Sequence, residues 1–285
     1  MKNKDPFIVG TAVFAALCLI ITAIVLFSKG ENRIEHTVVC SSDPAYVLAM
    51  NLLDGTGCKV LNLADGKQDA DEDLPEPEAF LTVGGELNDV SAINAMYLDL
   101  AVICISDAHS EESNPHIWLN ADFMADCIDY VSAALIERFP DIKDRIKNNA
   151  RRYLDSVFNG PYNKKLELTE KLESRGDLIR CICFGEDLDV FAASVGIYSI
   201  AVLSDNEAGS PTAEEIENAA EKAKKYTEVI ILAEEKYTSA AEKLAQATGA
   251  TLIILDPLTS GKDSGAYIRG MNKNFDAMEN YLNNA

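Results

Sequence analysis

Short apolar runs alternate with stretches of helical periodicity over most of the chain. The runs cover residues 37–40, 59–63, 79–83 and 100–105 in the first half, and 178–184, 197–203, 228–232 and 251–255 in the second. Unbroken apolar runs of this length are typical of strands that are buried on both faces. Their alternation with helices predicts an α/β protein, in which helices cover both faces of a parallel sheet.

Several helices are marked by an apolar face or by their ends. Residues 44–53 form a predicted helix that Gly55 and Gly57 terminate. Apolar residues repeat at helical spacing between residues 124 and 135, and again between residues 268 and 282. Each of these segments should therefore pack one face against a sheet.

Capping patterns predict where two further helices begin. Ser210 and Pro211 are a cap residue and a proline suited to the first helical position. Residues 239–242 read Ser-Ala-Ala-Glu, which is a capping box, and Gly249 closes the helix that follows.

The alternation stops at residues 141–173, which are highly charged and favour helix, with a predicted break at residues 159–161. The pattern predicts two parallel-sheet lobes, residues 36–140 and 175–285, joined by a long bridging helix in residues 141–174. We expect such a bridge to limit lobe closure to a small angle.

The amino terminus carries a long apolar segment. Residues 7–27 contain no charged side chain, and at about 1.5 Å per residue they are long enough to cross a bilayer core of about 30 Å. No small-residue cleavage site follows, and Leu17 is large where a lipid-modified Cys18 would need a small neighbour. We therefore predict that residues 1–35 are an uncleaved membrane anchor, with Lys2 and Lys4 in the cytoplasm and the bulk of the chain outside.

Charge and cysteine content exclude several functions. The 46 acidic and 25 basic residues give a net charge of −21, which argues against nucleic acid and favours cations as partners. Cys40 and Cys58 fall at opposite ends of adjacent predicted strands, too far apart for a disulfide. The cysteines at 104, 127, 181 and 183 lie in apolar patterns, so buried thiols are expected, and the absence of a Cys-x-x-Cys motif argues against a thiolate zinc site.

The residues with the clearest chemistry lie in or near residues 114–120, which contain the only tryptophan and His116, one of three histidines. An imidazole that follows a proline and precedes a packed aromatic ring is suited to metal binding, although a lone histidine is more often an ordinary loop residue. Polar residues also follow the predicted strands, where ligands bind in open parallel sheets. These residues are Asp65, Asp107, His109, Glu186, Asp205, Glu234 and Asp256.

The acidic loop at residues 65–73 stays open to two interpretations. It is either a solvated loop or a source of a metal ligand, and its spacing does not fit an EF-hand. No nucleophile elbow and no glycine-rich phosphate loop follows a strand, so enzyme signatures are missing.

The segment 114–119, Asn-Pro-His-Ile-Trp-Leu, resembles the Asp-Pro-His-x-Trp-Leu motif of the zinc and manganese substrate-binding proteins of ABC importers. Residues 82–87, 230–238 and 249–258 resemble further segments of that family, in the same order. The resemblance implies two α/β lobes joined by a long helix, and a metal site made by three histidines and a carboxylate. His116 and Asp256 occupy two of these four positions.

The other two positions depart from the family pattern. The loop after the second strand has no histidine, and Gly185 falls where the second lobe of the family opens with histidine. We expect Glu186 to be the third ligand, and His109 or an acidic residue of the 65–73 loop to be the fourth. A site poor in histidine shifts preference toward harder ions such as manganese, or abolishes tight binding.

The resemblance implies an extracytoplasmic, monomeric solute-binding protein that captures zinc or manganese as cargo and delivers it to the permease of an ABC importer. Two alternatives remain. A diverged binding protein of the same fold, holding another ligand or a partner protein, would explain the missing histidines. A surface metal-dependent hydrolase would need a general base and an open coordination position, which nothing singles out.

Overall fold

The computed structural model describes residues 36–65, 76–84, 99–109, 116–203, 211–259 and 261–284. The predicted anchor at residues 1–35 and residues 66–73 of the acidic loop lie outside these ranges. Within them, none of the helices is both long and apolar enough to cross a membrane.

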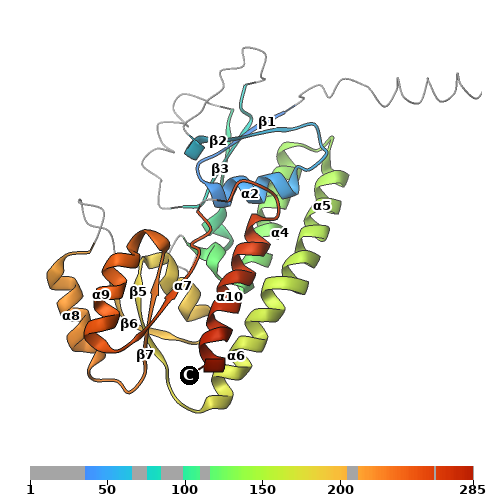
Figure 1. Cartoon of the computed structure of the whole chain (residues 1–285). Helices are drawn as coiled ribbons and strands as arrows, with labels where there is room; N and C mark the ends of the chain where they lie inside the picture. Colours follow the sequence, from blue (N-terminus) through green and yellow to red (C-terminus); the bar gives the residue numbers. More distant parts are fainter. Residues whose placement is uncertain are drawn as a thin grey trace, which may run out of the picture.

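Two separate four-stranded sheets form the centres of two lobes (Figure 1). The first sheet has the order β2-β1-β3-β4, and its strands are β1 (Thr37–Cys40), β2 (Lys59–Asn62), β3 (Ala79–Thr82) and β4 (Ala101–Cys104). The second has the order β6-β5-β7-β8, and its strands are β5 (Arg180–Phe184), β6 (Tyr198–Leu203), β7 (Val229–Ala233) and β8 (Thr251–Ile254). Every strand pair is parallel. The predicted fold class, with two parallel-sheet lobes, is confirmed.

The helices follow the strands in the predicted order. The α-helices are α2 (Asp43–Leu52), α4 (Ala121–Arg138), α5 (Lys143–Val157), α6 (Asn163–Arg175), α7 (Glu186–Ser194), α8 (Ala213–Ala223), α9 (Thr238–Thr248) and α10 (Ala266–Asn284). Short 3₁₀ turns are η1 (Leu63–Asp65), η2 (Ile105–His109), η3 (Ile117–Leu119) and η5 (Glu235–Tyr237).

The bridge between the lobes stays helical where a break was predicted. Helices α5 and α6 are joined by a π-helical turn, η4 (Phe158–Tyr162), which contains the buried Pro161. A π-turn absorbs the missing N–H of a proline by widening the helix locally, so the helix continues. Helix α10 runs beside this rod (Figure 1), and its side chains pair with α6 through Lys164–Asp276 and Lys171–Glu279.

Two of the predicted helix starts are wrong. Helix α8 is capped by Thr212, which forms a reciprocal capping box with Glu215. Helix α9 begins at Thr238, so Ser239 already lies inside the helix and does not cap it. The 3₁₀ turn after β7 leads directly into α9 and leaves no extended residue for a cap. Gly249 ends α9 with φ +74°, as predicted.

One continuous core joins the lobes to the connecting helices. It includes Leu81 from the first sheet, Tyr153 from α5, Cys181 from the second sheet and Phe275 from α10. The six cysteines of the described ranges are all free thiols, and burial raises the pKa of Cys127 to about 12, so this thiol is unreactive.

Asn149 joins α5 to the end of α2. The side chain is 2% exposed, and its Nδ2 donates to the carbonyls of Leu52 (2.9 Å) and Asp54 (2.8 Å). Because alanine would leave two carbonyls without this donor, Asn149→Ala is expected to lower the free energy of unfolding by about 2 kcal/mol. Urea unfolding followed by circular dichroism measures the loss, and a change below about 0.5 kcal/mol would contradict it.

His36 links the start of β1 to two carboxylates. Its Nδ1 lies 2.7 Å from Glu78 and its Nε2 lies 3.1 Å from Asp141. Burial acts to lower the pKa of His36, but the hydrogen bonds to Glu78 and Asp141 outweigh it and raise the pKa. The same contact with His36 holds the pKa of Asp141 below its usual range.

This pairing makes stability depend on pH. Because the folded pKa of His36 is raised, its contribution is fully present below pH of about 6.5 and is lost as the pH rises through the folded pKa. We expect His36→Gln to cost on the order of 1 kcal/mol at pH 5.5 and clearly less at pH 8.5. Urea unfolding at both values tests this, and an equal loss at the two values would refute it.

Candidate metal centre

The segment that contains His116 and Trp118 is fixed between the two lobes. His116 precedes the buried turn η3 and is itself partly buried, with its ring 5.0 Å from that of Trp118. Trp118 Nε1 donates to the carbonyl oxygen of Pro257 at 3.1 Å. Asn120 then caps α4 by accepting from the N–H of Asp122. The loop of the first lobe that carries His116 is thus bonded to the loop of the second lobe that carries Asp256.

Asp256 is held in place at the end of β8. Its N–H donates to Asn274 Oδ1 (2.7 Å), and Asn274 Nδ2 donates back to its carbonyl (2.8 Å). One carboxylate oxygen, Oδ1, accepts from the N–H of Leu258, which has the unusual φ of 63°. The side chain is half-buried. The turn therefore fixes the orientation of Asp256 and leaves Oδ2 outside this hydrogen bond.

Two buried carboxylates, those of Asp187 and Glu234, lie around Gly185 in the second lobe. A Cβ atom at Gly185 would lie 2.3 Å from Asp187 Oδ1 and 3.4 Å from Glu234 Oε1. Asp187 and Glu234 are 7% and 8% exposed. These carboxylates therefore occupy the space that a side chain at position 185 would need.

Positively charged groups act on the Asp187 and Glu234 carboxylates. Lys236 Nζ lies 3.3 Å from Glu234 Oε1 and 4.7 Å from the centre of the Tyr237 ring. Burial raises the pKa of Asp187, opposed by the Leu188 N–H and by the charges of His116 and Lys236. His116 of the first lobe therefore lies near enough to Asp187 of the second to act on it electrostatically.

Two of the predicted metal ligands, Glu186 and His109, have surroundings that differ from those of Asp187 and Glu234. Glu186, the first residue of α7, is exposed. His109 stacks on Phe123 of α4 with ring centres 3.9 Å apart. Its Nε2 lies 2.8 Å from Asp126 Oδ2, but without the geometry of a hydrogen bond.

In the parts of the chain that the structure describes, no three His, Cys, Asp or Glu side chains converge closely enough to hold a metal ion. The assignment of His116, Asp256, Glu186 and His109 as ligands therefore stays a prediction. Side-chain direction explains why sequence reasoning missed Asp187. Alignment placed Glu186 beside the missing histidine, but the first residue of α7 faces solvent and the next one turns back over Gly185. The available signal in the sequence was a second acidic residue, two positions after the glycine that follows β5.

The family model described as "Zinc-uptake complex component A periplasmic" matches residues 59–281. The chain belongs to this family. It is therefore the metal-capturing, solute-binding component of an uptake system, as the resemblance implied.

The chain shares its fold with several solved structures. "Crystal structure of ZnuA" is 21% identical, has a TM-score of 0.64, and covers 85% of this chain and 99% of that one. The solute-binding protein FpvC of Pseudomonas aeruginosa, in complex with Ni²⁺, is 16% identical with a TM-score of 0.70 and covers 87% and 97%. A Cd-bound periplasmic metal-binding protein from Candidatus Liberibacter asiaticus is 16% identical with a TM-score of 0.69 and covers 87% and 100%. No curated protein sequence matches the chain.

Proposed function

We propose that the protein captures a divalent transition-metal ion between its lobes and delivers it to the membrane permease of an ABC importer. His116 of the first lobe would supply the nitrogen ligand, and Asp187, Glu234 and Asp256 of the second lobe would supply oxygen ligands. This assignment rests on the two buried carboxylates around Gly185, which are those of Asp187 and Glu234. His116 is near enough to Asp187 to act on it electrostatically. Buried carboxylates are kept where a cation or a hydrogen-bond network offsets their burial.

The donor set indicates the class of ion. One imidazole and several carboxylates suit manganese better than a three-histidine site does, and they also accept zinc at about 2.0 to 2.2 Å. Among proteins of similar fold, FpvC was solved in complex with Ni²⁺ and with Mn²⁺, and the Candidatus Liberibacter asiaticus protein was solved with cadmium bound. We therefore propose manganese or zinc as cargo, with manganese preferred.

Lys236 balances the carboxylates before the metal arrives. Its ammonium group beside Glu234 provides one positive charge where a divalent ion would provide two. Metal loading would then exchange a lysine contact for metal coordination and draw His116 toward the carboxylates.

We infer the location of the protein from its sequence. Residues 1–35 would hold the full chain at the cell membrane, with both lobes outside the cytoplasm and available to the permease as a monomer. Catalysis is not part of the proposal, because solute capture needs neither a nucleophile nor a general base.

Calorimetric titration of the full chain in detergent with Mn²⁺ and Zn²⁺ tests this function. We expect one site per chain with a Kd of about 1 μM or lower, and release of protons when the imidazole must deprotonate. If neither ion binds below about 1 mM, the diverged binding protein without metal becomes the better description.

A further inference from the structure

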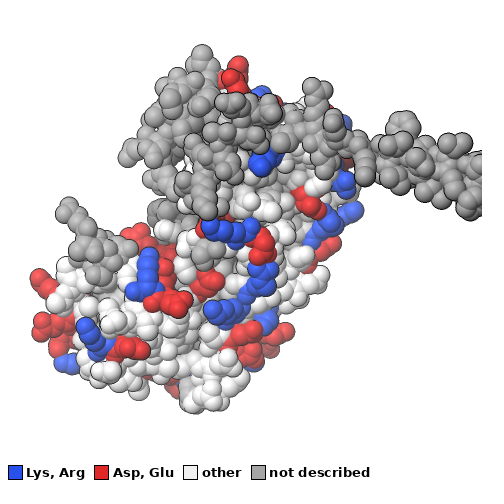
Figure 2. All heavy atoms as spheres, turned by 45° about the horizontal axis from the view of Figure 1, so that its top comes forward, with Lys and Arg blue, Asp and Glu red and all other residues white. Residues whose placement is uncertain are grey.

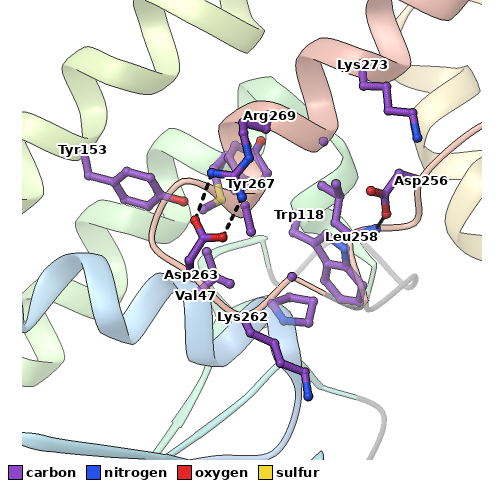
Figure 3. A pocket seen from close by; sticks show the side chains of 15 residues that line it. Val47, Trp118, Tyr153, Asp256, Leu258, Lys262, Asp263, Tyr267, Arg269 and Lys273 are labelled. Carbon is purple, nitrogen blue, oxygen red and sulfur yellow. Dashed lines mark hydrogen bonds and ion pairs between the residues drawn. The ribbon is translucent and has the colours of Figure 1, made fainter.

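A second site is formed where both lobes and the connecting helix meet. It is a cavity of about 390 Å³ that lies beside Asp256 but is lined largely by other elements. Its walls include Val47 of α2, Trp118, Tyr153 of α5, and Tyr267 and Lys273 of α10 (Figure 3). The cavity is within the range of about 300 to 1,000 Å³ that holds small organic ligands, and it is far larger than a bare ion needs.

Two buried tyrosines are among the residues that line this cavity. Tyr153 and Tyr267 are 4% and 5% exposed, and their rings pack edge to face with centres 6.5 Å apart. Neither hydroxyl oxygen has a hydrogen-bond partner in the part of the chain that the structure describes. Burial raises the pKa of both phenols, so each stays a neutral O–H donor. Buried donors of this kind are normally satisfied, which points to a ligand with acceptor oxygens.

The charge of the lining is opposite to that of the protein. Three cations line the cavity, namely Lys262, Arg269 and Lys273, against the two carboxylates Asp256 and Asp263. The chain as a whole carries −21. Figure 2 shows Lys and Arg side chains across the middle of the molecule, with Asp and Glu side chains among them. A positive lining in so acidic a protein favours an anion.

The positive groups are spread around the cavity rather than gathered at one point. Arg269 is held by two hydrogen bonds to Asp263, at 2.9 and 2.6 Å (Figure 3). Lys262 and Lys273 lie toward opposite sides of the view in Figure 3. The first turn of α10, with Ala266 and Tyr267, adds the positive end of a helix, although the N–H of Ala266 already donates to the carbonyl oxygen of Asp263 at 3.0 Å.

We propose that this cavity binds a small organic anion that carries two or three carboxylates. One carboxylate accepts from the hydroxyls of Tyr153 and Tyr267, and the others pair with Lys262 and Lys273 at the rim. The hydrocarbon part lies against Val47, Met124 and Leu258, which make up the apolar wall. A compact phosphate ion satisfies fewer of these separated groups than an extended polycarboxylate does.

The test uses metal-free full chain in detergent and the fluorescence of Trp118. This residue is the only tryptophan and lines the cavity, so its emission reports occupancy directly. Tricarballylate serves as the probe because it has three carboxylates and no hydroxyl. We expect a saturable change in emission with a Kd of about 10 to 100 μM, while sodium chloride at equal ionic strength gives none. Since no metal is present, the result is independent of the proposed metal function.

Two variants test whether the change in Trp118 emission comes from binding in this cavity. Lys273→Gln removes a rim charge and should weaken tricarballylate binding about three- to tenfold, whereas Lys225→Gln, the same change at an exposed lysine of the second lobe, should leave it within about twofold. Tyr153→Phe removes a buried hydroxyl without a partner, so the thermal midpoint of the ligand-free protein should stay or rise while binding weakens about tenfold. A purely structural tyrosine would instead lower the midpoint and leave binding unchanged.

Three results would overturn the proposal. The first is a response to tricarballylate that does not saturate or that sodium chloride reproduces. The second is tighter binding of inorganic phosphate than of tricarballylate, which would assign the cavity to a different ligand class. The third is equal weakening by Lys273→Gln and Lys225→Gln, which would show only long-range charge.

Discussion

Replacing His116 by alanine is expected to weaken manganese or zinc binding by about 100-fold or more, because it removes the one imidazole that lies near the buried carboxylates. The variant should fold, since His116 is only partly buried at the start of a short turn. Calorimetric titration measures the loss. His109→Ala is the matched histidine variant and also tests the prediction from the sequence that His109 is a ligand. Because His109 faces Asp126 on α4, we expect the affinity of this variant to stay within about threefold of the parent.

Asp187→Asn separates metal binding from folding in the same titration. Burial raises the pKa of Asp187, so the ionised carboxylate destabilises the metal-free protein, and this cost disappears as the pH falls and the carboxyl group is protonated. Asparagine keeps an oxygen that can accept from the N–H of Leu188. We expect the metal-free protein to unfold at the same temperature or higher, and metal affinity to fall at least about tenfold. A lower melting temperature with unchanged affinity would assign Asp187 a structural role.

Replacing Gly185 by alanine is expected to lower the free energy of unfolding by about 3 kcal/mol or more. The backbone there has φ +120°, and an added Cβ would lie 2.3 Å from Asp187 Oδ1. Backbone strain of this kind costs about 1 to 3 kcal/mol, and displacement of a buried carboxylate adds to it. The same change should weaken metal binding, because Asp187 and Glu234 must move apart.

Gly196 provides the matched control for this substitution. It also has a positive φ, +81°, but an added Cβ would meet nothing within 4 Å. Gly196→Ala should therefore cost only about 1 kcal/mol, from the backbone alone. Urea unfolding of both variants measures the difference, and equal losses would mean that the contact with Asp187 contributes nothing.

The positions of the strands could be predicted closely, because a strand that is buried on both faces consists of consecutive apolar residues. The run at residues 37–40 is β1, and the run at 251–255 extends one residue past β8. The start of α9 was harder, because a Ser-x-x-Glu pattern is equally compatible with the interior of a helix. The long connector was predicted from its charge and helical propensity, but not its continuity through Pro161.

The candidate site was predictable only as far as loops can be placed at a sheet edge. His116 and Asp256 come from loops that the structure joins through Trp118 and Pro257, as their positions after the strands suggested. Which acid replaces a missing histidine depends instead on side-chain direction at the first turn of α7. The tyrosine-lined cavity has no local signal at all, because Tyr153 and Tyr267 come from different helices far apart in the chain.

The π-turn in the connector has a mechanical consequence. Helices α5 and α6 form one rod about 50 Å long at about 1.5 Å per residue, with the turn Phe158–Tyr162 near its middle. Bending by about 5° at that turn moves the far end of α6, about 20 Å away, by about 2 Å. Metal–ligand distances tolerate only about 0.2 Å. A rod that bends at this turn would move the second lobe relative to the first, and a bend too small to alter the outline of the protein would be enough to make or break the proposed coordination of the metal.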